Sequence, residues 1–285
     1  MVLKSINYWS FPGGLEGTLC PFEAIQLAKS HGFEAIELCL GDGPEMNLDT
    51  TEEFCKKLIQ EGKDLGVQIA SVASGLYWSR ALGDAGESAR KQAISDLERM
   101  LQITSWLGAK TLLTIPGAVD VFFLPDREKL SYGHVLRYAT EGIRAVLPTA
   151  ERCKVRMGIE NVWNKFLLSP NEMADFIDQF GSPWIGAYVD VANLMPFGHP
   201  ADWLRHLNRR VVGIHFKDFR RSVGTIDGFV DLLEGDVPWP DVMAAIAEIG
   251  YDGPVAAEMI PGYAHYPMVR IANTSNAMDA ILGRG

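Results

Sequence analysis

The feature that most constrains the fold is an alternation, repeated eight times, between a short apolar run and a longer segment with helical periodicity. The short runs are rich in β-branched residues and are bounded by loops, which is typical of buried strands in a parallel sheet. They are Ser5–Trp9, Ala35–Leu40, Gln68–Ala73, Thr111–Ile115, Met157–Glu160, Ile185–Val191, Val211–Phe216 and Val255–Met259. The helical segments that follow them are Pro21–Ser30, Thr51–Leu65, Ser88–Leu107, Tyr132–Arg152, Pro170–Phe180, Ala201–Asn208, Trp239–Ile249 and Pro267–Leu282.

The residues at the segment ends agree with this alternation. Ser169 and Pro170 place a capping hydroxyl before a proline at the first helical position. Glycines that can adopt a left-handed conformation end several helical segments, namely Gly32, Gly66, Gly108, Gly181 and Gly250. Repeated strand–helix units form parallel sheets with right-handed crossovers, and eight such units close into a barrel. We therefore predict an α/β protein, a single (β/α)8 TIM barrel that occupies residues 1–285 as one domain.

Charge and cysteine content limit the partners of the chain. The formal net charge of −10 opposes binding to nucleic acid, which requires a basic surface, and disfavours adsorption to anionic membranes. No apolar run approaches the roughly 20 residues that span a bilayer, and the N-terminal segment lacks the apolar stretch of a signal peptide. No C-x-x-C pair occurs among Cys20, Cys39, Cys55 and Cys153. We therefore expect free thiols and a cytoplasmic protein.

The last four predicted strands each carry a potential metal ligand near the carboxyl end. These residues are Glu160 in MGIEN, Asp190 in AYVDVAN, His215 in VVGIHFKD and Glu258 in VAAEM. Catalytic residues of (β/α)8 barrels lie at this end of the strands. Three carboxylates at one barrel mouth would repel one another, and a shared divalent cation is the simplest way to balance their charge. Three oxygen ligands and one imidazole suit Mn²⁺, with Mg²⁺, Co²⁺ or Zn²⁺ as alternatives.

The two glutamates of this set suit proton transfer next to a carbonyl group. Glu160 and Glu258 come from different strands, so we expect them on different sides of the metal. One carboxylate can remove a proton from the carbon beside a metal-polarised carbonyl, and the resulting enediolate is stabilised by the cation. Return of the proton on the same face gives aldose–ketose isomerisation, whereas delivery by the second carboxylate inverts the stereocentre. The spacing of the residues allows either reaction.

Several longer segments resemble the xylose-isomerase-like superfamily of sugar-phosphate isomerases and epimerases. They are IENVWNKFLLSP, GAYVDVANL, VVGIHFKDF and LLEGDVPWPDVMAAIAEIGYDGPVAAEM. The resemblance covers nearly the whole chain and points to the ketose 3-epimerases, the pentulose-5-phosphate 3-epimerases and sequences described as hexulose-6-phosphate isomerase. It implies a small sugar or sugar-phosphate substrate, and an acid/base pair formed by Glu160 and Glu258. The metal ligands that it implies are Glu160, Asp190, His215 and Glu258.

The resemblance also bears on substrate contacts. Arg221, six residues after His215, matches an arginine that contacts substrate oxygens in the 3-epimerases. Where those enzymes carry a second glutamate and a histidine that hold sugar hydroxyls, this chain carries Phe166 and Asn193. These departures imply a different substrate and favour the sugar-phosphate branch.

Further candidates for substrate binding follow from position in the strands. Lys217 has the same side-chain parity as His215, so its amine either faces the pocket or pairs with an aspartate at the rim. Together with Arg220 and Arg221 it forms a candidate phosphate-binding loop, unless these arginines are merely solvated. Aromatic residues near strand ends can supply an apolar wall for a sugar or pack in the core. They are Tyr8, Trp9, Trp78 and Trp163.

Three other functions are alternatives for a barrel with these strand-end residues. Apurinic-site endonucleases of the same superfamily need further histidines on the second to fourth strands, and ELCL, SVAS and LLTIPG contain none. A cyclic-polyol (inosose-type) dehydratase would use the same metal ligands, so only its product distinguishes it. A non-catalytic sugar-binding barrel would have no use for a pair of acid/base glutamates. A dimer or tetramer is possible, and the sequence fixes neither.

Overall fold

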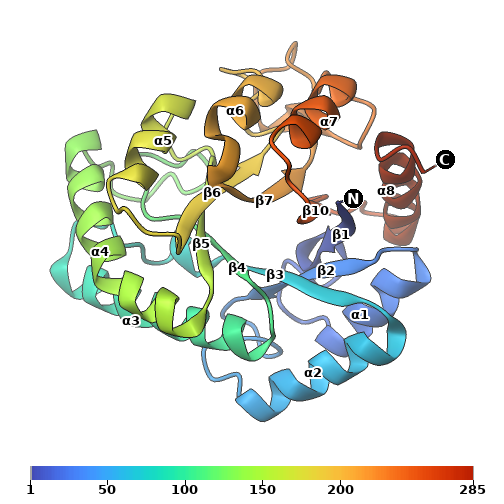
Figure 1. The fold of residues 1–285 in the computed structure, drawn as a ribbon, viewed down its shortest axis with the longest axis horizontal. Coiled ribbons are helices and arrows are strands. Elements are labelled where there is room, and N and C mark those ends of the chain that lie inside the picture. Colours follow the sequence, from blue (N-terminus) through green and yellow to red (C-terminus); the bar gives the residue numbers. More distant parts are fainter. Residues whose placement is uncertain (1, 285) are drawn as a thin grey trace.

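A closed parallel barrel forms the centre of the protein (Figure 1). The computed structural model describes residues 2–284. In that range the barrel strands are β1 (Leu3–Asn7), β2 (Ala35–Leu40), β3 (Gln68–Ser74), β4 (Thr111–Thr114), β5 (Arg156–Glu160), β6 (Ile185–Asp190), β7 (Val211–Phe216) and β10 (Pro254–Ala257). The hydrogen-bonded order around the barrel is β1, β10, β7, β6, β5, β4, β3 and β2, so each strand lies beside its neighbour along the chain. The predicted (β/α)8 TIM barrel is confirmed.

A ring of helices surrounds these strands (Figure 1). The helices are α1 (Pro21–Ser30), α2 (Glu52–Leu65), α3 (Glu87–Trp106), α4 (Tyr132–Cys153), α5 (Pro170–Asp178), α6 (Pro200–Leu207), α7 (Trp239–Glu248) and α8 (Pro267–Ile281). Between β7 and α7 the chain adds a short antiparallel pair, β8 (Asp218–Phe219) and β9 (Phe229–Val230). Within residues 2–284, none of the helices is both long and apolar enough to cross a membrane.

Local boundary chemistry explains where several helices begin and end. The five glycines predicted at helix ends all adopt φ between +56° and +78°, a region that only glycine enters without strain. Before α5, the Ser169 hydroxyl accepts a hydrogen bond from the backbone of Glu172, and the Glu172 side chain returns to the cap. Pro170 occupies the first turn of this helix. Both predictions of helix ends are therefore confirmed.

The first strand differs from its prediction. It was expected over Ser5–Trp9, but β1 ends at Asn7 and the next three residues form a 3₁₀ helix, Tyr8–Ser10. The Asn7 side chain accepts a hydrogen bond from the backbone N–H of Trp9, and this cap turns the chain out of the strand. The apolar pattern continues across the turn because Tyr8 is buried beneath it.

Strand register brings the carboxyl ends of β5, β6, β7 and β10 together. Asp190 pairs with His215 across β6 and β7, and His215 pairs with Ala256 across β7 and β10. Glu160 pairs with Tyr188 across β5 and β6. Glu258 follows the last residue of β10 directly. The polar side chains that the sequence places at the strand ends therefore share one mouth of the barrel.

Candidate metal centre and pocket

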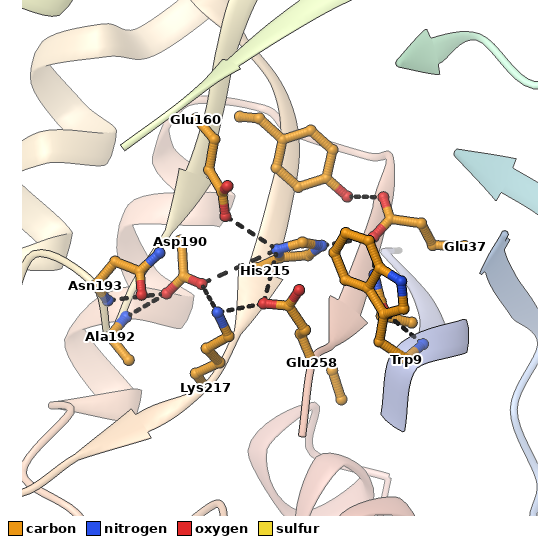
Figure 2. Close-up of polar contacts among 12 residues, drawn as sticks. Trp9, Glu37, Glu160, Asp190, Ala192, Asn193, His215, Lys217 and Glu258 are labelled. Carbon is orange, nitrogen blue, oxygen red and sulfur yellow. Dashed lines mark hydrogen bonds and ion pairs between the residues drawn. The ribbon is translucent and has the colours of Figure 1, made fainter. Parts of the chain in front are cut away.

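Four buried side chains converge at this mouth and can hold a metal ion (Figure 2). One potential ligand atom from each lies within 4.8 Å of the others. The residues are Glu160 at the end of β5, Asp190 at the end of β6, His215 in β7 and Glu258 just after β10. The structure thus brings together the set that the sequence indicated.

The distances around His215 show how this cluster is arranged. Its Nδ1 atom lies 3.4 Å from Glu160 Oε1, 3.6 Å from Glu258 Oε2 and 4.0 Å from Asp190 Oδ2. His215 Nδ1 is buried without a hydrogen-bond partner, and the buried Asp190 Oδ2 has no hydrogen bond apart from its ion pair with Lys217. An unpaired buried polar atom is costly, and a cation at this position would give His215 Nδ1 a partner and would also bind Asp190 Oδ2. The donor set, three carboxylates and one imidazole, therefore fits a divalent metal.

The position of Asp190 is fixed by hydrogen bonds from the loop that follows it. Its Oδ1 atom accepts hydrogen bonds of 2.9 Å from the backbone N–H groups of Ala192 and Asn193. The Asn161 side chain donates to the Asp190 carbonyl and accepts from the Asp190 N–H. Because Oδ1 is fully engaged, Oδ2 is the oxygen that faces the cluster.

His215 is oriented by a second buried carboxylate, Glu37 of β2. Its Nε2 atom lies 2.6 Å from Glu37 Oε1, and since a carboxylate only accepts, Nε2 carries a proton. Glu37 also accepts hydrogen bonds from Asn7, Ser71 and Tyr188. Burial would raise the pKa of Glu37, but the charge of His215 and these donors outweigh it and lower the pKa to about 2. Nδ1 is thereby left to face the metal position, as in other histidine sites supported by carboxylates.

An ammonium group lies beside the cluster. Lys217 Nζ lies 2.9 Å from Asp190 Oδ2 and also contacts Glu258 (Figure 2). Burial would lower the pKa of Lys217, but the negative charges of Asp190, Glu258 and Glu160 outweigh it and raise the pKa above its usual value. The amine is therefore charged, and it pairs with aspartate inside the pocket rather than at the outer rim.

Glu160 is poised to change its protonation state near neutral pH. Burial raises its pKa to about 7, because the hydrogen bond and charge of His215 only partly offset the loss of water. A carboxyl group with a pKa near the working pH can both accept and donate a proton.

A pocket opens directly above the cluster. Its lining includes Glu160, Glu258, Lys217, Asn193 and Trp163, the last of which donates from its indole to the Asn193 carbonyl over 2.6 Å. Further aromatic rings complete the wall, namely Trp9, Trp78, Phe122, Phe123 and Phe229. Three expected substrate contacts, Asn193, Trp163 and Lys217, therefore lie where a ligand could reach them.

Two other expected contacts lie elsewhere. Tyr8 is buried, and its hydroxyl donates to the Leu19 carbonyl, so the ring faces a neighbouring cavity. Arg221 is exposed in the loop after β8, where its backbone N–H donates to Asp236. Phe166, at one of the positions that departs from the resembling family, is 1% exposed and packs against Tyr132 in the helical layer.

Sequence reasoning overlooked several residues of the pocket. Phe122 and Phe123 lie in the long loop after β4, where no strand pattern assigns a direction to a side chain. Arg270 belongs to α8, far along the chain from the strand ends. Asn161 does not line the pocket but holds the backbone of Asp190, and its position directly after Glu160 was the available signal. Glu37, in β2, is fully buried and contacts His215 from behind the cluster.

Comparisons with known proteins place this geometry in context. Residues 25–278 match the family described as xylose isomerase-like TIM barrel. The L-ribulose-5-phosphate 3-epimerase UlaE of Escherichia coli O1:K1 / APEC is 22% identical over 287 residues, which cover 100% of this chain and 98% of that protein. Among solved structures, D-psicose 3-epimerase with D-tagatose from Clostridium cellulolyticum H10 superimposes with a TM-score of 0.79 at 15% identity, covering 99% of both chains. The IOLI protein with a bound zinc atom gives a TM-score of 0.76 at 14% identity, again covering 99% of both chains.

Proposed function

This chain belongs to the xylose isomerase-like TIM-barrel family, and on that premise we propose that it is a divalent-metal-dependent sugar epimerase. We propose a ketose or a pentulose phosphate as the substrate and C3 as the reacting carbon. The observation that carries the proposal is the position of two glutamates, Glu160 and Glu258, on either side of one imidazole nitrogen at the floor of the pocket.

The metal ligands in this proposal are the four converging side chains. Glu160, Asp190, His215 and Glu258 would hold the ion, with Mn²⁺ as the best match to three carboxylates and one imidazole. When bound, the ion supplies Lewis-acid polarisation of the substrate carbonyl and stabilises negative charge on its oxygen. The IOLI protein, a structural neighbour, binds a zinc atom, so a protein of this fold can hold a divalent metal.

The proton transfers fall to Glu160 and Glu258. One carboxylate takes the proton from the carbon next to the substrate carbonyl, and the electron pair of the broken C–H bond moves toward the carbonyl oxygen. The other carboxyl group delivers a proton to the opposite face of that carbon, the carbonyl re-forms and the stereocentre is inverted.

Other groups of the pocket would orient the substrate. Asn193 and Lys217 line the pocket next to the ligands and can bind substrate oxygens. The Trp163 ring, fixed by its hydrogen bond to the Asn193 carbonyl, can pack against C–H groups. The surrounding apolar rings exclude water, which strengthens electrostatic interactions at the reacting carbon.

Solvent hydrogen exchange tests the proposal. The Mn²⁺-loaded protein is incubated in D₂O with free and phosphorylated pentuloses and hexuloses, and the metal is removed before NMR spectra are recorded. Deuterium at C3 together with the epimer supports a 3-epimerase. Deuterium at C1 or C2 with an aldose product indicates an isomerase instead, and loss of water from a cyclic polyol indicates a dehydratase.

Two variants assign the roles of the glutamates. Glu160→Gln and Glu258→Gln should each abolish epimer formation, because each removes one partner of the proton transfer. A single variant that still exchanges deuterium without forming the epimer would identify the remaining glutamate as the base on one face. Full epimerase activity in both variants would refute the proposed pair.

A further inference from the structure

One side of the pocket is a continuous wall of aromatic rings in contact with one another. Ring centroids lie 5.0 Å apart for Trp78 and Phe123, 5.2 Å for Phe123 and Phe122, 5.9 Å for Phe122 and Trp163, and 5.3 Å for Trp163 and Phe229. All five rings line the pocket above the glutamates. Phe122 and Phe123 are still 48% and 45% exposed, so their faces are available to a ligand.

The cationic side chains of the pocket are already paired. Within residues 2–284, Lys217 and Arg270 are the lysine and arginine that line it. Lys217 contacts the carboxylates of Asp190 and Glu258. Arg270 is 6% exposed and pairs with Asp231, its Nε lying 2.7 Å from Asp231 Oδ1. Both cations are thus already engaged by carboxylates of the protein.

The backbone donors after β7 are also occupied. In many barrels the loops after the seventh and eighth strands bind phosphate through N–H groups. Here the fully buried carboxylate of Asp218 accepts hydrogen bonds of 2.9, 2.9 and 3.1 Å from the backbone N–H groups of Phe219, Leu233 and Val237. The indole of Trp239 donates to it as well. An internal carboxylate thus occupies these three backbone donors of the loop after β7.

The two arginines of the candidate phosphate loop do not reach the pocket either. Arg220 is exposed, donates to the Glu234 carbonyl and lies 3.6 Å from the Glu234 carboxylate. Arg221 is exposed as well. Neither residue belongs to the pocket lining. The groups that a phosphate dianion needs are therefore paired elsewhere or outside the pocket.

We propose that the pocket takes an uncharged keto-sugar linked to a second ring with an apolar face, which stacks on the aromatic wall formed by Trp78, Phe123, Phe122, Trp163 and Phe229. The second ring is a further sugar or an aryl group, since both present such a face. This inference rests on the proposed epimerase function for the reacting end of the substrate. The reacting carbon is the one next to the keto group, which is C3 in L-ribulose and C2 or C4 in a 3-keto glycoside. It replaces the phosphate branch of that proposal with an uncharged glycoside.

Binding measurements test the inference independently of turnover. The protein is loaded with Mg²⁺, and saturation-transfer NMR titrations compare phenyl 3-keto-β-D-glucopyranoside, 3-ketolactose, methyl 3-keto-β-D-glucopyranoside, L-ribulose and L-ribulose 5-phosphate. We expect the phenyl glycoside or 3-ketolactose to bind about tenfold tighter than the methyl glycoside, which corresponds to about 1.4 kcal/mol from the added ring contacts. The stronger of the two ligands identifies the second ring as aryl or sugar. We expect L-ribulose 5-phosphate to bind more weakly than L-ribulose.

The outcomes separate this inference from the proposed function. Equal binding of the methyl, phenyl and lactose-derived ligands would overturn the inference, as would tighter binding of the phosphate than of L-ribulose. Deuterium exchange with the same compounds is measured in parallel on the Mn²⁺-loaded protein. Deuterium exchange in L-ribulose 5-phosphate, together with tighter binding of it than of L-ribulose, would support the epimerase proposal and contradict the inference. Ring-selective binding without deuterium exchange in any probe would support the inference about the aromatic wall and contradict the epimerase proposal.

A wall variant and a matched control complete the test. Phe122→Ala should reduce the preference for the phenyl over the methyl glycoside several-fold, because it removes a half-exposed ring from the wall. Leu136→Ala removes an exposed apolar side chain on α4 that does not line the pocket, and it should leave the preference unchanged. An unchanged preference in Phe122→Ala, with the protein folded, would contradict the stacking role.

Discussion

The Nζ atom of Lys217 lies 2.9 Å from the Oδ2 atom of Asp190, an oxygen that faces the proposed metal position. The same ammonium contacts Glu258. One positive charge of the protein is therefore shared between two of the carboxylates at the proposed metal position. A divalent ion that binds at the four ligands must compete with this ammonium for two of them.

Removal of the ammonium should strengthen metal binding. We expect Lys217→Met to bind Mn²⁺ about tenfold more tightly, because loss of one positive charge near the ion removes repulsion worth about 1.4 kcal/mol or more. Isothermal titration calorimetry of the metal-free protein measures the affinity. Lys165→Met serves as the control, since it breaks a surface ion pair with Asp120. An affinity equal to or below that of the parent would show that Lys217 does not compete with the ion.

Loss of the carboxylate behind His215 should weaken metal binding. Each Glu37 oxygen accepts two hydrogen bonds, from Asn7 and His215 on one side and from Ser71 and Tyr188 on the other. In Glu37→Gln the negative charge is lost and one amide oxygen replaces two carboxylate oxygens, so the imidazole is held less firmly in its orientation. Mn²⁺ affinity should fall by about 10–100-fold.

The measurement for Glu37→Gln is electron paramagnetic resonance of free Mn²⁺ during titration. Glu34→Gln is the matched control, because Glu34 lies near the other end of the barrel, where it binds Lys4 N–H and Arg284. Retention of parent affinity in folded Glu37→Gln would contradict the orienting role of this residue.

The convergence of the four candidate ligands was predictable from the sequence. Each lies at or just after the end of a strand whose side chains alternate regularly between the two faces. Parallel strands in a closed barrel end at one rim, so Glu160, Asp190, His215 and Glu258 had to share one mouth once eight units were recognised. The strand ends at Asp190 and Phe216 also differ by at most one residue from the prediction. Regular periodicity therefore determined both the fold and the polar floor of the pocket.

The walls of the pocket were not predictable in the same way. Phe122 and Phe123 sit in a loop without period, and their direction depends on contacts with Trp78 and Trp163. Arg221 was expected to face the substrate by resemblance, but it is exposed and does not line the pocket, although Ile226 of the same β8–β9 connection does. Side chains placed by loop conformation need the tertiary structure before their role can be assigned.

A methyl group added at Gly213 should disturb the support of the metal site. An added Cβ would lie 2.5 Å from Cδ2 of Tyr188, whose hydroxyl donates to Glu37 over 2.6 Å. Gly213→Ala should therefore lower the free energy of unfolding by about 1–3 kcal/mol, as overpacking does, and weaken Mn²⁺ binding by displacing Tyr188. Urea denaturation and metal titration measure the two effects.

The control for Gly213→Ala is another glycine. An added Cβ at Gly133, near the start of α4, meets no atom within 4 Å, so Gly133→Ala should leave the stability unchanged or raise it. A free energy of unfolding in Gly213→Ala equal to that of the parent would contradict this prediction, because Tyr188 would then accommodate the added methyl group without loss of stability.

Thiol reactivity should distinguish Cys20 from the other cysteines. Cys20 is partly exposed, whereas Cys39, Cys55 and Cys153 are buried. Burial raises the pKa of Cys55 to about 11, and burial likewise raises the pKa values of Cys39 and Cys153. At pH 8 the thiolate fraction of Cys55 is then about one in a thousand, and only thiolates react with disulfide reagents. We expect one fast thiol with Ellman's reagent, and a Cys20→Ser variant should lack it.

The same shift fixes the direction of a pH effect on stability. An unfolded thiol ionises near pH 8.5, whereas Cys55 in the fold ionises near about 11. Its contribution to the free energy of unfolding is therefore complete below about pH 8.5 and is lost as the pH rises toward about 11. Urea titrations at pH 7.5 and 10 should show a lower midpoint at pH 10, and Cys55→Ala should reduce that difference. Two results would contradict the burial that raises the pKa of Cys55. One is a second thiol that reacts fast with Ellman's reagent at pH 8, and the other is a midpoint difference between pH 7.5 and 10 that is unchanged in Cys55→Ala.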